Sequence, residues 1–524
     1  SIVRAYGKHQ ITLMSELEVY NYFQYRVRYN DKINDKEDFV SDLILDISVM
    51  KNNMIPLSDY KPNCTEDKEM FEKFYTDYES YKDENNKLDF DDMLVLAKNI
   101  LDSNTEALEH IRSLYPYIQV DEYQDTNYIQ RDIIYQIAGE DGNLAVVGDD
   151  DQSIYMVRGA KPEIMLGFEK DYPKAKVIHM STNYRSEKNI IRKADEVIKN
   201  NKKRFKKDFL GSKEDEGKVY FRDYMNVASQ LGDIIYKIKK LIEDGVKPEE
   251  IAILYRTNKE STLFVDFFMK EKIPFRCNEK LKSKYEHWIF QDIQAYQKLS
   301  RGRNDVIAFH RILNHPNRYF FGKAFYNIPP DHNALCGAIA KQTGMKLWQI
   351  QKAYENANLL FTQLNNLKDM STDKFMQYLY LCVGYHDYIR DYAKSRNREP
   401  NELESLWSSF YREAAFYKDW NTWGRHIVNY NRKLQDINKN TNGITLSTMH
   451  RAKGLEWEHV FIINCIEGTI PHSTAGTPDE IEEERRLFYV AMTRAKKALY
   501  LSAYKKSEDD KTKLSRFIKE CSLA

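Results

Sequence analysis

The ten residues YIQVDEYQDT, Tyr117 to Thr126, join a short apolar run to three carboxylates within five positions. Such a cluster just beyond a strand has two common interpretations. One is a solvated turn. The other is a site for a divalent metal ion with a catalytic base beside it. The rest of the chain has to distinguish between them.

Two further apolar runs end in polar residues in the same way, LAVVGD (144–149) and KVIHMS (176–181). Helical stretches such as IQRDIIYQIAG (129–139) separate them, and this alternation is typical of a parallel α/β sheet. A second set of strand-like runs comes later: GKVYFRDY (217–224), IAILYRTN (251–258), GITLSTMH (443–450), HVFIINC (459–465) and ALYLSAY (498–504). The sequence therefore predicts an α/β fold.

Two long stretches, 15–112 and 279–440, have helical periodicity instead. In the first, Ser15 with Glu18 three residues on predicts a capping box. Its aromatic residues within DKEMFEKFYTDYESYKDENN (67–86) have the spacing of a core-facing helical stripe. We expect Trp420 and Trp423 of the second stretch to be core residues as well.

Composition limits the function classes. The 524 residues suggest three or four domains. Because 79 basic residues balance 79 acidic ones, any nucleic-acid surface has to be a local patch. The six cysteines are scattered with no C-x-x-C, which argues against a zinc site and favours a reducing cytoplasm. No apolar run is long enough for a membrane span.

The carboxyl ends of the strands carry the candidate site residues, because ligands of open parallel sheets bind there. Asp121 can hold Mg²⁺, and the adjacent Glu122 can deprotonate a water for attack on a γ-phosphate. In VVGDDDQSIYMVRGA (146–160), Gln152 offers an amide that can contact both a phosphate and a water. Tyr155 and Arg158 suit base stacking and phosphate contact, respectively.

Similar side chains come after the later strands. In STNYRSEKNI (181–190), Arg185 is a candidate phosphate clamp, and Tyr184 can stack on a base. Arg494 lies between a helix and a strand, a suitable place for an arginine finger. In the run at 443–450 the strand is expected to end at Thr448, and a polar turn containing His450, Lys453, Gly454 and Glu456 follows.

These stretches together resemble motifs II to VI of the UvrD, Rep and PcrA group of superfamily 1 DNA helicases. The matching segments are DEYQDTN (121–127), GDDDQSIY (148–155), NYRS (183–186), TMHRAKGLE (448–456) and EEERRLFYVAMTRA (482–495). They occur in the family's order, and the likeness extends from LDFDDML at residue 88 to LSRFI near residue 517. Five ordered motifs make the resemblance specific.

The resemblance implies an ATP-driven motor that pulls itself 3′ to 5′ along single-stranded DNA. Asp121 would hold Mg²⁺, and Glu122 would be the catalytic base. Gln152 would couple the state of the γ-phosphate to DNA, and Tyr184 would stack on adenine. Arg185 and Arg494 would grip the γ-phosphate from the second motor domain. The resemblance also places Glu456 near the nucleotide, and Tyr155, Arg158 and His450 along the DNA track.

The implied architecture has two RecA-like motor domains, the first of them incomplete, and two helical inserts. We expect a helical insert at 1–112, the remainder of the first motor domain at 113–182, the first part of the second at 183–278, a second insert at 279–440 and the last part at 441–524. The expected partners are single-stranded and partly duplex DNA, with no membrane, in the cytoplasm.

Two departures from the family matter. The family's stacking tryptophan in motif III is replaced by Val157, which has no π face. No G-x-x-x-x-G-K-[ST] loop occurs among the 524 residues, although family members carry one near the N-terminus. SIVRAYGKH (1–9) resembles a family segment that lies C-terminal to this loop, so we expect the loop portion either to have been truncated or to come from another chain.

Two interpretations stay open. The basic stretch RKADEVIKNNKKRFKKDF (192–209) either contacts phosphates or is a solvated connection. The chain is either an ATP-dependent 3′–5′ DNA helicase or translocase, or a catalytically inactive DNA-binding or regulatory relative. The full set of motif II to VI residues favours the enzyme, although without the loop the chain is expected to be inactive alone.

Overall fold

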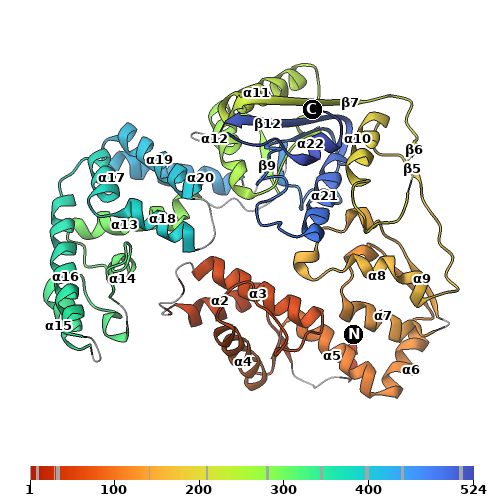
Figure 1. Ribbon diagram of the computed structural model, residues 1–524, viewed down its shortest axis with the longest axis horizontal. Coiled ribbons are helices and arrows are strands. Elements are labelled where there is room, and N and C mark those ends of the chain that lie inside the picture. Colours follow the sequence, from red (N-terminus) through yellow and green to blue (C-terminus); the bar gives the residue numbers. More distant parts are fainter. Residues whose placement is uncertain are drawn as a thin grey trace. The chain divides into compact units, whose positions relative to one another are not determined.

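The computed structural model describes residues 2–6, 11–28, 30, 33, 36–140, 142–207, 210–278, 283–320, 322–342, 346–395, 400–437, 442–506 and 511–523. The Gly-Lys-His segment at 7–9 lies outside them. The chain divides into two compact units, Ser1–Glu279 with Asn440–Ala524, and Lys280–Lys439 (Figure 1). All candidate site residues belong to the first unit.

This unit contains two α/β parts. A six-stranded parallel sheet forms the second of them along the chain. In spatial order its strands are β7 (Lys218–Asn226), β12 (Ala495–Lys506), β11 (Trp457–Ile462), β8 (Ile251–Tyr255), β10 (Ile444–Thr448) and β9 (Phe275–Cys277). All five residues of β8 are buried, as expected for a central strand covered on both faces. The five predicted runs between 217 and 504 are thereby confirmed as strands.

Helices cover both faces of this sheet. On one face, α10 (Lys188–Ile198), α21 (Pro478–Met492) and α22 (Arg516–Glu520) share a buried apolar core with the strands. On the other side of β7 and β12 lies α11 (Val227–Glu243) (Figure 1). The helix α12 (Ser261–Glu271) connects β8 to β9.

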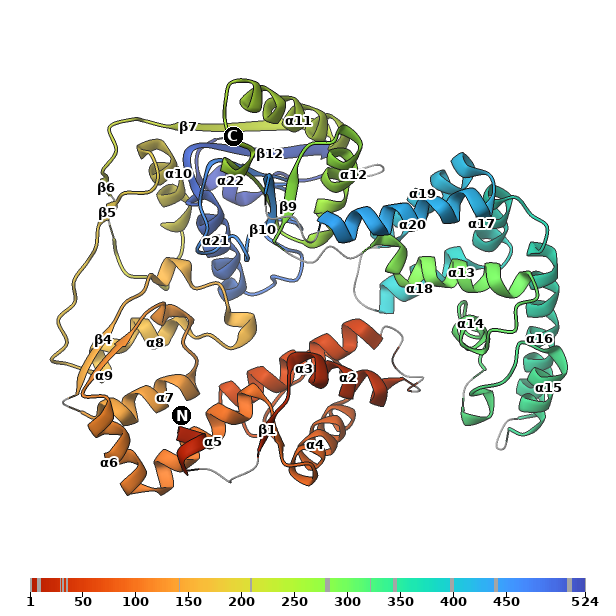
Figure 2. The ribbon, with the colours of Figure 1, turned by 180° about the vertical axis from the view of Figure 1, so that it is seen from behind.

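The first α/β part contains a smaller parallel sheet, in which β3 (Tyr117–Val120) pairs with β4 (Asn143–Val146); β4 is labelled in Figure 2. The helix α7 (Tyr128–Ala138) connects them, and α8 (Pro162–Leu166) and α9 (Phe168–Asp171) come next. Alternate residues of both strands are exposed. Tyr117 is 76% exposed and Val147, just after β4, is 55% exposed. One face of this sheet is therefore exposed to solvent. Both fold-class expectations, α/β layers and parallel sheets, are confirmed.

The prediction of a strand at 176–181 was wrong. The structure assigns no strand there; the next one, β5 (Thr182–Asn183), pairs with β6 (Leu210–Gly211) instead. Ile178 and Met180 are 74% and 82% exposed. A strand needs a hydrogen-bonding neighbour, and the described sheet at this place consists of β3 and β4 alone.

The residues before β3 are mostly helical, and those between Met14 and Tyr81 share a core of their own. Its elements are α1 (Ile2–Tyr6), β1 (Thr12–Leu13), α2 (Glu16–Val27), α3 (Lys36–Asn52), α4 (Lys68–Glu84), β2 (Lys87–Leu88), α5 (Phe90–Ser103) and α6 (Thr105–Leu114). The predicted capping box is confirmed, since Ser15 and Glu18 accept each other's backbone N–H. Phe71 and Tyr78 of the aromatic stripe are buried, which confirms their prediction as core residues.

The second unit is helical throughout its described secondary structure. Its α-helices are α13 (Trp288–Ser300), α14 (Val306–Ile312), α15 (His332–Ala340), α16 (Leu347–Leu367), α17 (Thr372–Leu381), α18 (Tyr385–Ser395), α19 (Pro400–Tyr417) and α20 (Trp420–Ile437). Trp423 is fully buried, as predicted, and Trp420 stacks on it while staying partly exposed. Among the described residues, no helix is both long and apolar enough to cross a membrane.

Candidate active site

The turn after β3 presents two carboxylates on a firmly anchored backbone. Tyr123 is buried, and its N–H donates to the Val147 carbonyl at 2.9 Å. Asp121 and Glu122 just before it are exposed. Glu122 has φ 51° and ψ 40°, a left-handed conformation that costs a residue other than glycine roughly 1–3 kcal/mol. Strain of this kind is common at functional sites, where the surrounding structure holds it.

Gln124, which the sequence did not single out, connects this turn to the one after β4. Its side chain is buried, with Nε2 donating to Glu122 Oε2 at 2.5 Å and Oε1 accepting from the Asp149 N–H at 3.0 Å. A Cβ at Gly148 would lie 2.4 Å from that same Oε1, so a larger residue there would displace the Gln124 amide. No spacing rule could have revealed this, although Gln124 is part of the opening stretch.

Gln152 lies where the two α/β parts meet. Its Nε2 donates to Asp149 Oδ2 at 2.8 Å, and its Oε1 accepts from Arg494 Nη2 at 3.4 Å. Its backbone carbonyl accepts from Lys453 Nζ at 2.9 Å. The structure therefore brings together residues of the predicted motifs III, V and VI.

Lys453 is a second residue whose role the sequence left unassigned. Its Nζ lies 2.5 Å from Asp125 Oδ2 and 3.6 Å from Glu122 Oε2, and its side chain is 9% exposed. Burial raises the pKa of Asp125, although the Lys453 ammonium opposes this. The only signal in the sequence was its place in the polar turn after β10. Lys453 thus puts a positive charge beside the candidate base.

The candidate arginine finger is buried yet charged. Arg494 is 1% exposed, with Nε donating to the Val490 carbonyl at 3.0 Å. Burial, and to a smaller extent the positive charge of Arg185, lowers the pKa of Arg494 to about 10. The guanidinium is therefore protonated at neutral pH, and its Nη2 donates to Gln152.

Glu456 pairs with cations. Its Oε1 lies 2.8 Å from Lys496 Nζ and its Oε2 accepts from Arg185 Nε at 2.6 Å. Hydrogen bonds from Lys496 and then Arg185 lower the pKa of Glu456 to about 2. Glu456 therefore orients the Arg185 side chain, while the neighbouring Tyr184 is 75% exposed and has an accessible ring.

The residues predicted to contact DNA also lie near one another. The Tyr155 ring has Lys453 Nζ 5.1 Å and the Arg158 guanidinium carbon 5.4 Å from its centroid, which is within the range of cation–π contacts. Burial, the charge of Arg256 and, to a smaller extent, the charge of Arg158 lower the pKa of His450. The side chain of Val157 lies outside the described part of the chain.

Two family models match almost the whole chain. The UvrD/REP helicase N-terminal domain matches residues 2–173, and the UvrD-like helicase C-terminal domain matches residues 178–506, more than half of the sequence. The chain belongs to the UvrD-like helicase family. The resemblance inferred from the five motifs is therefore confirmed.

The chain is also similar in sequence to individual proteins named as DNA helicases. The chain is 31% identical over 525 residues to the putative ATP-dependent DNA helicase YjcD of Bacillus subtilis, covering 98% of the chain and 67% of that protein. It is 31% identical to the ATP-dependent DNA helicase PcrA of Staphylococcus aureus strain Mu50, covering 90% of the chain and 66% of the relative. For PcrA of Staphylococcus epidermidis the identity is 32%, with 87% and 64% covered. The chain thus spans about two thirds of the length of these relatives.

Two cations of the basic stretch at 192–209, Arg204 and Lys207, pair with carboxylates of the chain itself. Arg204 binds Asp151 through two nitrogens at 2.8 and 2.9 Å, and Lys207 Nζ lies 2.5 Å from Asp149 Oδ1. Asp149, Asp150 and Asp151 have the spacing of a metal-binding group, but Lys207 contacts all three. These cations therefore neutralise the acidic turn that precedes Gln152.

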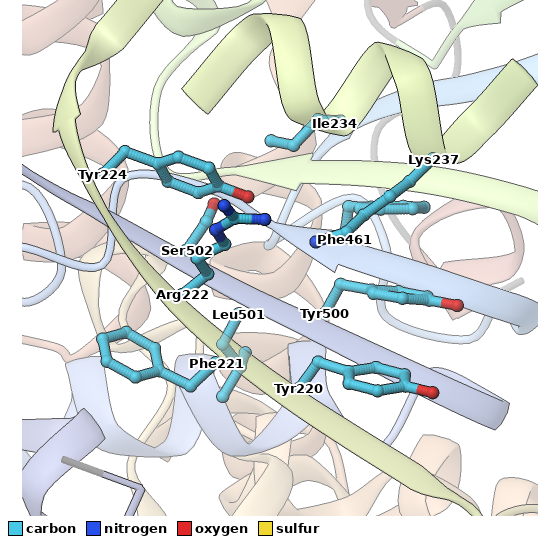
Figure 3. Close-up of a pocket in the computed structure, with 10 residues that line it drawn as sticks. All are labelled: Tyr220, Phe221, Arg222, Tyr224, Ile234, Lys237, Phe461, Tyr500, Leu501 and Ser502. Atoms are coloured by element: carbon cyan, nitrogen blue, oxygen red, sulfur yellow. The ribbon is translucent and has the colours of Figure 1, made fainter. Parts of the chain in front are cut away.

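A separate cavity of about 170 Å³ lies on the α11 side of the six-stranded sheet (Figure 3). Tyr220, Tyr500 and Phe461 stack in a row across three neighbouring strands, with ring centroids 5.0 and 4.3 Å apart. Its lining includes none of the candidate site residues.

The half-buried imidazole of His450 predicts a pH-dependent stability. Burial and then the charge of Arg256 lower its pKa from 6.5 to about 4, with Glu484 opposing. Because the folded-state pKa is lower than the unfolded one, the folded protein disfavours the proton. His450 therefore contributes full stability above pH 6.5, and loses up to about 3 kcal/mol of it as the pH falls to about 4.

We expect His450→Asn to flatten this dependence, measured as the change in melting temperature between about pH 7 and about pH 4.5. His179→Asn, at an exposed histidine, is the control and should melt with the pH dependence of the original chain. Equal pH dependence in all three proteins would show that His450 is protonated without cost.

Proposed function

We propose that this protein is an ATP-dependent DNA helicase or translocase motor that moves 3′ to 5′ along single-stranded DNA. The main support is the position of Gln152, in contact with both Arg494 and Lys453. Lys453 in turn reaches the carboxylates of the turn after β3. Residues of four motifs, distant in sequence, thus meet at the strand ends, where α/β proteins bind ligands.

The available donors fit ATP with Mg²⁺. Asp121 offers exposed carboxylate oxygens, the hard ligands that Mg²⁺ prefers. The exposed ring of Tyr184 is free to stack on adenine. When bound, Mg²⁺ would neutralise charge on the phosphate oxygens.

In this proposal each side chain has one task. Glu122 orients a water and takes its proton, and Arg185 and Arg494 stabilise the negative charge that develops on the transferred phosphoryl group. Gln152 senses the γ-phosphate from a position that also contacts the second α/β part. Tyr155, Arg158 and His450 line the path of single-stranded DNA.

We further propose that a phosphate-binding loop reaches this site from a segment in addition to the 524 residues, in the same protein or in a partner chain. Two strands rarely form a stable sheet alone, and one face of the sheet of β3 and β4 is exposed, as are Ile178 and Met180. Further strands and a helix carrying the loop would cover these apolar side chains. The alternative, a DNA-binding protein without ATPase activity, is favoured only by the lack of a G-x-x-x-x-G-K-[ST] sequence.

A motor of this kind works where ATP and DNA are present, so we also propose a cytoplasmic location. In the experiments with ATP, "loop-supplied protein" means the chain joined to, or mixed with, the loop-bearing N-terminal segment of a family relative. Activity that appears only with this segment would distinguish the enzyme from the inactive alternative.

The polarity is tested with tailed duplexes. We expect the loop-supplied protein to separate a duplex with a 3′ single-stranded tail in the presence of ATP, and to leave a blunt duplex or one with a 5′ tail intact. Strand separation is measured by the fluorescence of a dye and quencher pair at the duplex end. Preference for the 5′ tail would show that the proposed direction is wrong.

A further inference from the structure

The loop at 202–207, between α10 and β6, is fixed to α21. Glu482 accepts from the backbone N–H groups of Lys202 and Lys203 at 2.8 and 3.3 Å. Arg486 donates to the Lys203 carbonyl at 2.8 Å. Because Arg494 lies just beyond the end of α21, the loop and the candidate arginine finger are held by the same helix.

The other side of this loop holds the acidic turn before Gln152. Asp150 and Asp151 are fully buried, and Arg204 donates to Asp151 while the Phe205 N–H donates to Asp150 at 2.8 Å. Buried carboxylates need such partners, since an unpaired buried charge is strongly destabilising. The contacts of Arg204 and the Phe205 N–H therefore stabilise the turn, and we assign them no part in the ATPase reaction.

Lys207 differs from Arg204 because its partner Asp149 also contacts the side chain of Gln152. Asp149 receives Lys207 Nζ on Oδ1 at 2.5 Å and the amide of Gln152 on Oδ2 at 2.8 Å. The Gln152 amide thus donates with its nitrogen to Asp149 and accepts with its oxygen from Arg494. Burial opposes the charge of Lys207, but the three aspartates, Asp149 first, raise its pKa above the ordinary value.

We propose that Lys207 is a positioning residue for Gln152, acting through Asp149. It fixes the Asp149 carboxylate, which fixes the orientation of the Gln152 amide and keeps its oxygen toward Arg494. Because loop 202–207 is also fixed to α21, the helix that precedes Arg494, the positions of Gln152 and Arg494 relative to each other are maintained. This inference rests on the proposed function, because it assigns a role within the same ATPase site.

The kinetic test uses Lys207→Met in the loop-supplied protein. Methionine keeps much of the length of lysine and removes its charge. We expect kcat for ATP hydrolysis with single-stranded DNA to fall between about 10- and 100-fold, the effect of a misplaced catalytic group, with KM for ATP nearly unchanged. Lys206→Met is the matched control, since Lys206 is adjacent and exposed, and it should hydrolyse ATP like the original protein.

The decisive comparison is made in a Gln152→Ala background. If Lys207 acts through Gln152, adding Lys207→Met to Gln152→Ala lowers kcat no further. If Lys207 only stabilises the fold, the two losses combine and the melting temperature falls with them. The proposal would be overturned if the losses in kcat from the two substitutions multiply in the double variant. It would also be overturned if Lys207→Met alone has the kcat of the unsubstituted protein.

A second readout needs no ATPase activity. In the 524-residue chain, Lys207→Met should speed amide hydrogen exchange at residues 149–153, where the Gln152 and Ser153 N–H groups donate to carbonyls of the same turn. Lys206→Met should not. Equal exchange in both variants would overturn the proposal even if the loop-supplied protein hydrolyses ATP. Faster exchange combined with no ATPase activity in the unsubstituted loop-supplied protein would instead contradict the proposed function.

Discussion

Replacing Glu122 with glutamine is expected to reduce the ATP turnover of the loop-supplied protein by about 10²–10⁴-fold, the usual contribution of a general base. The substitution preserves size and keeps an oxygen that can accept from Gln124, which now donates to Glu122 at 2.5 Å. It removes the proton acceptor that the proposal requires. ATP affinity should change little, because Asp121, Tyr184 and both arginines remain.

The measurements are kcat by phosphate release and ATP affinity by a fluorescent ATP analogue. Glu106→Gln, at an exposed position of α6, is the matched control for the loss of one carboxylate. Turnover near that of the control would show that Glu122 is not the base. The strained backbone of Glu122 makes the melting temperature a necessary second measurement, and it should stay unchanged because glutamine has the same backbone requirements.

The position of Asp121 and Glu122 could be predicted from the sequence because it depends on local rules. An apolar run that ends in carboxylates marks a strand end, and strand ends in parallel sheets hold ligands. The same rule failed at 176–181, where Ile178 and Met180 are exposed, because a strand also needs a neighbour to pair with. Apolar composition alone cannot reveal whether that neighbour is present.

The contacts of Gln124, Lys453 and Lys207 could not be predicted, because each depends on how distant segments meet. Lys453 reaches Asp125 across more than three hundred residues of sequence, and Lys207 reaches Asp149 across more than fifty. The basic stretch was open to two interpretations because charge in a sequence does not reveal its partner. In the structure, Arg204 and Lys207 of this stretch pair with carboxylates of the chain itself.

The largest effect is expected from the phosphate-binding loop. Such a loop cradles phosphates with backbone N–H groups and neutralises them with a lysine. The 524 residues contain no G-x-x-x-x-G-K-[ST] sequence, and Lys453, the buried ammonium beside Glu122, is already paired with Asp125. We therefore expect ATP hydrolysis by this chain alone to equal the rate without protein, even with single-stranded DNA. ATP binding should be correspondingly weak.

The central claim, that these residues form the ATPase site of a DNA motor, is tested most directly by ATP hydrolysis with and without the loop. Phosphate release is measured for the chain alone, for the loop-bearing segment alone and for the loop-supplied protein, each with and without an unstructured oligonucleotide. The account predicts hydrolysis only by the loop-supplied protein, stimulated by the oligonucleotide and abolished by Glu122→Gln. Hydrolysis by the chain alone, or none by a loop-supplied protein that is folded and binds ATP, would contradict it.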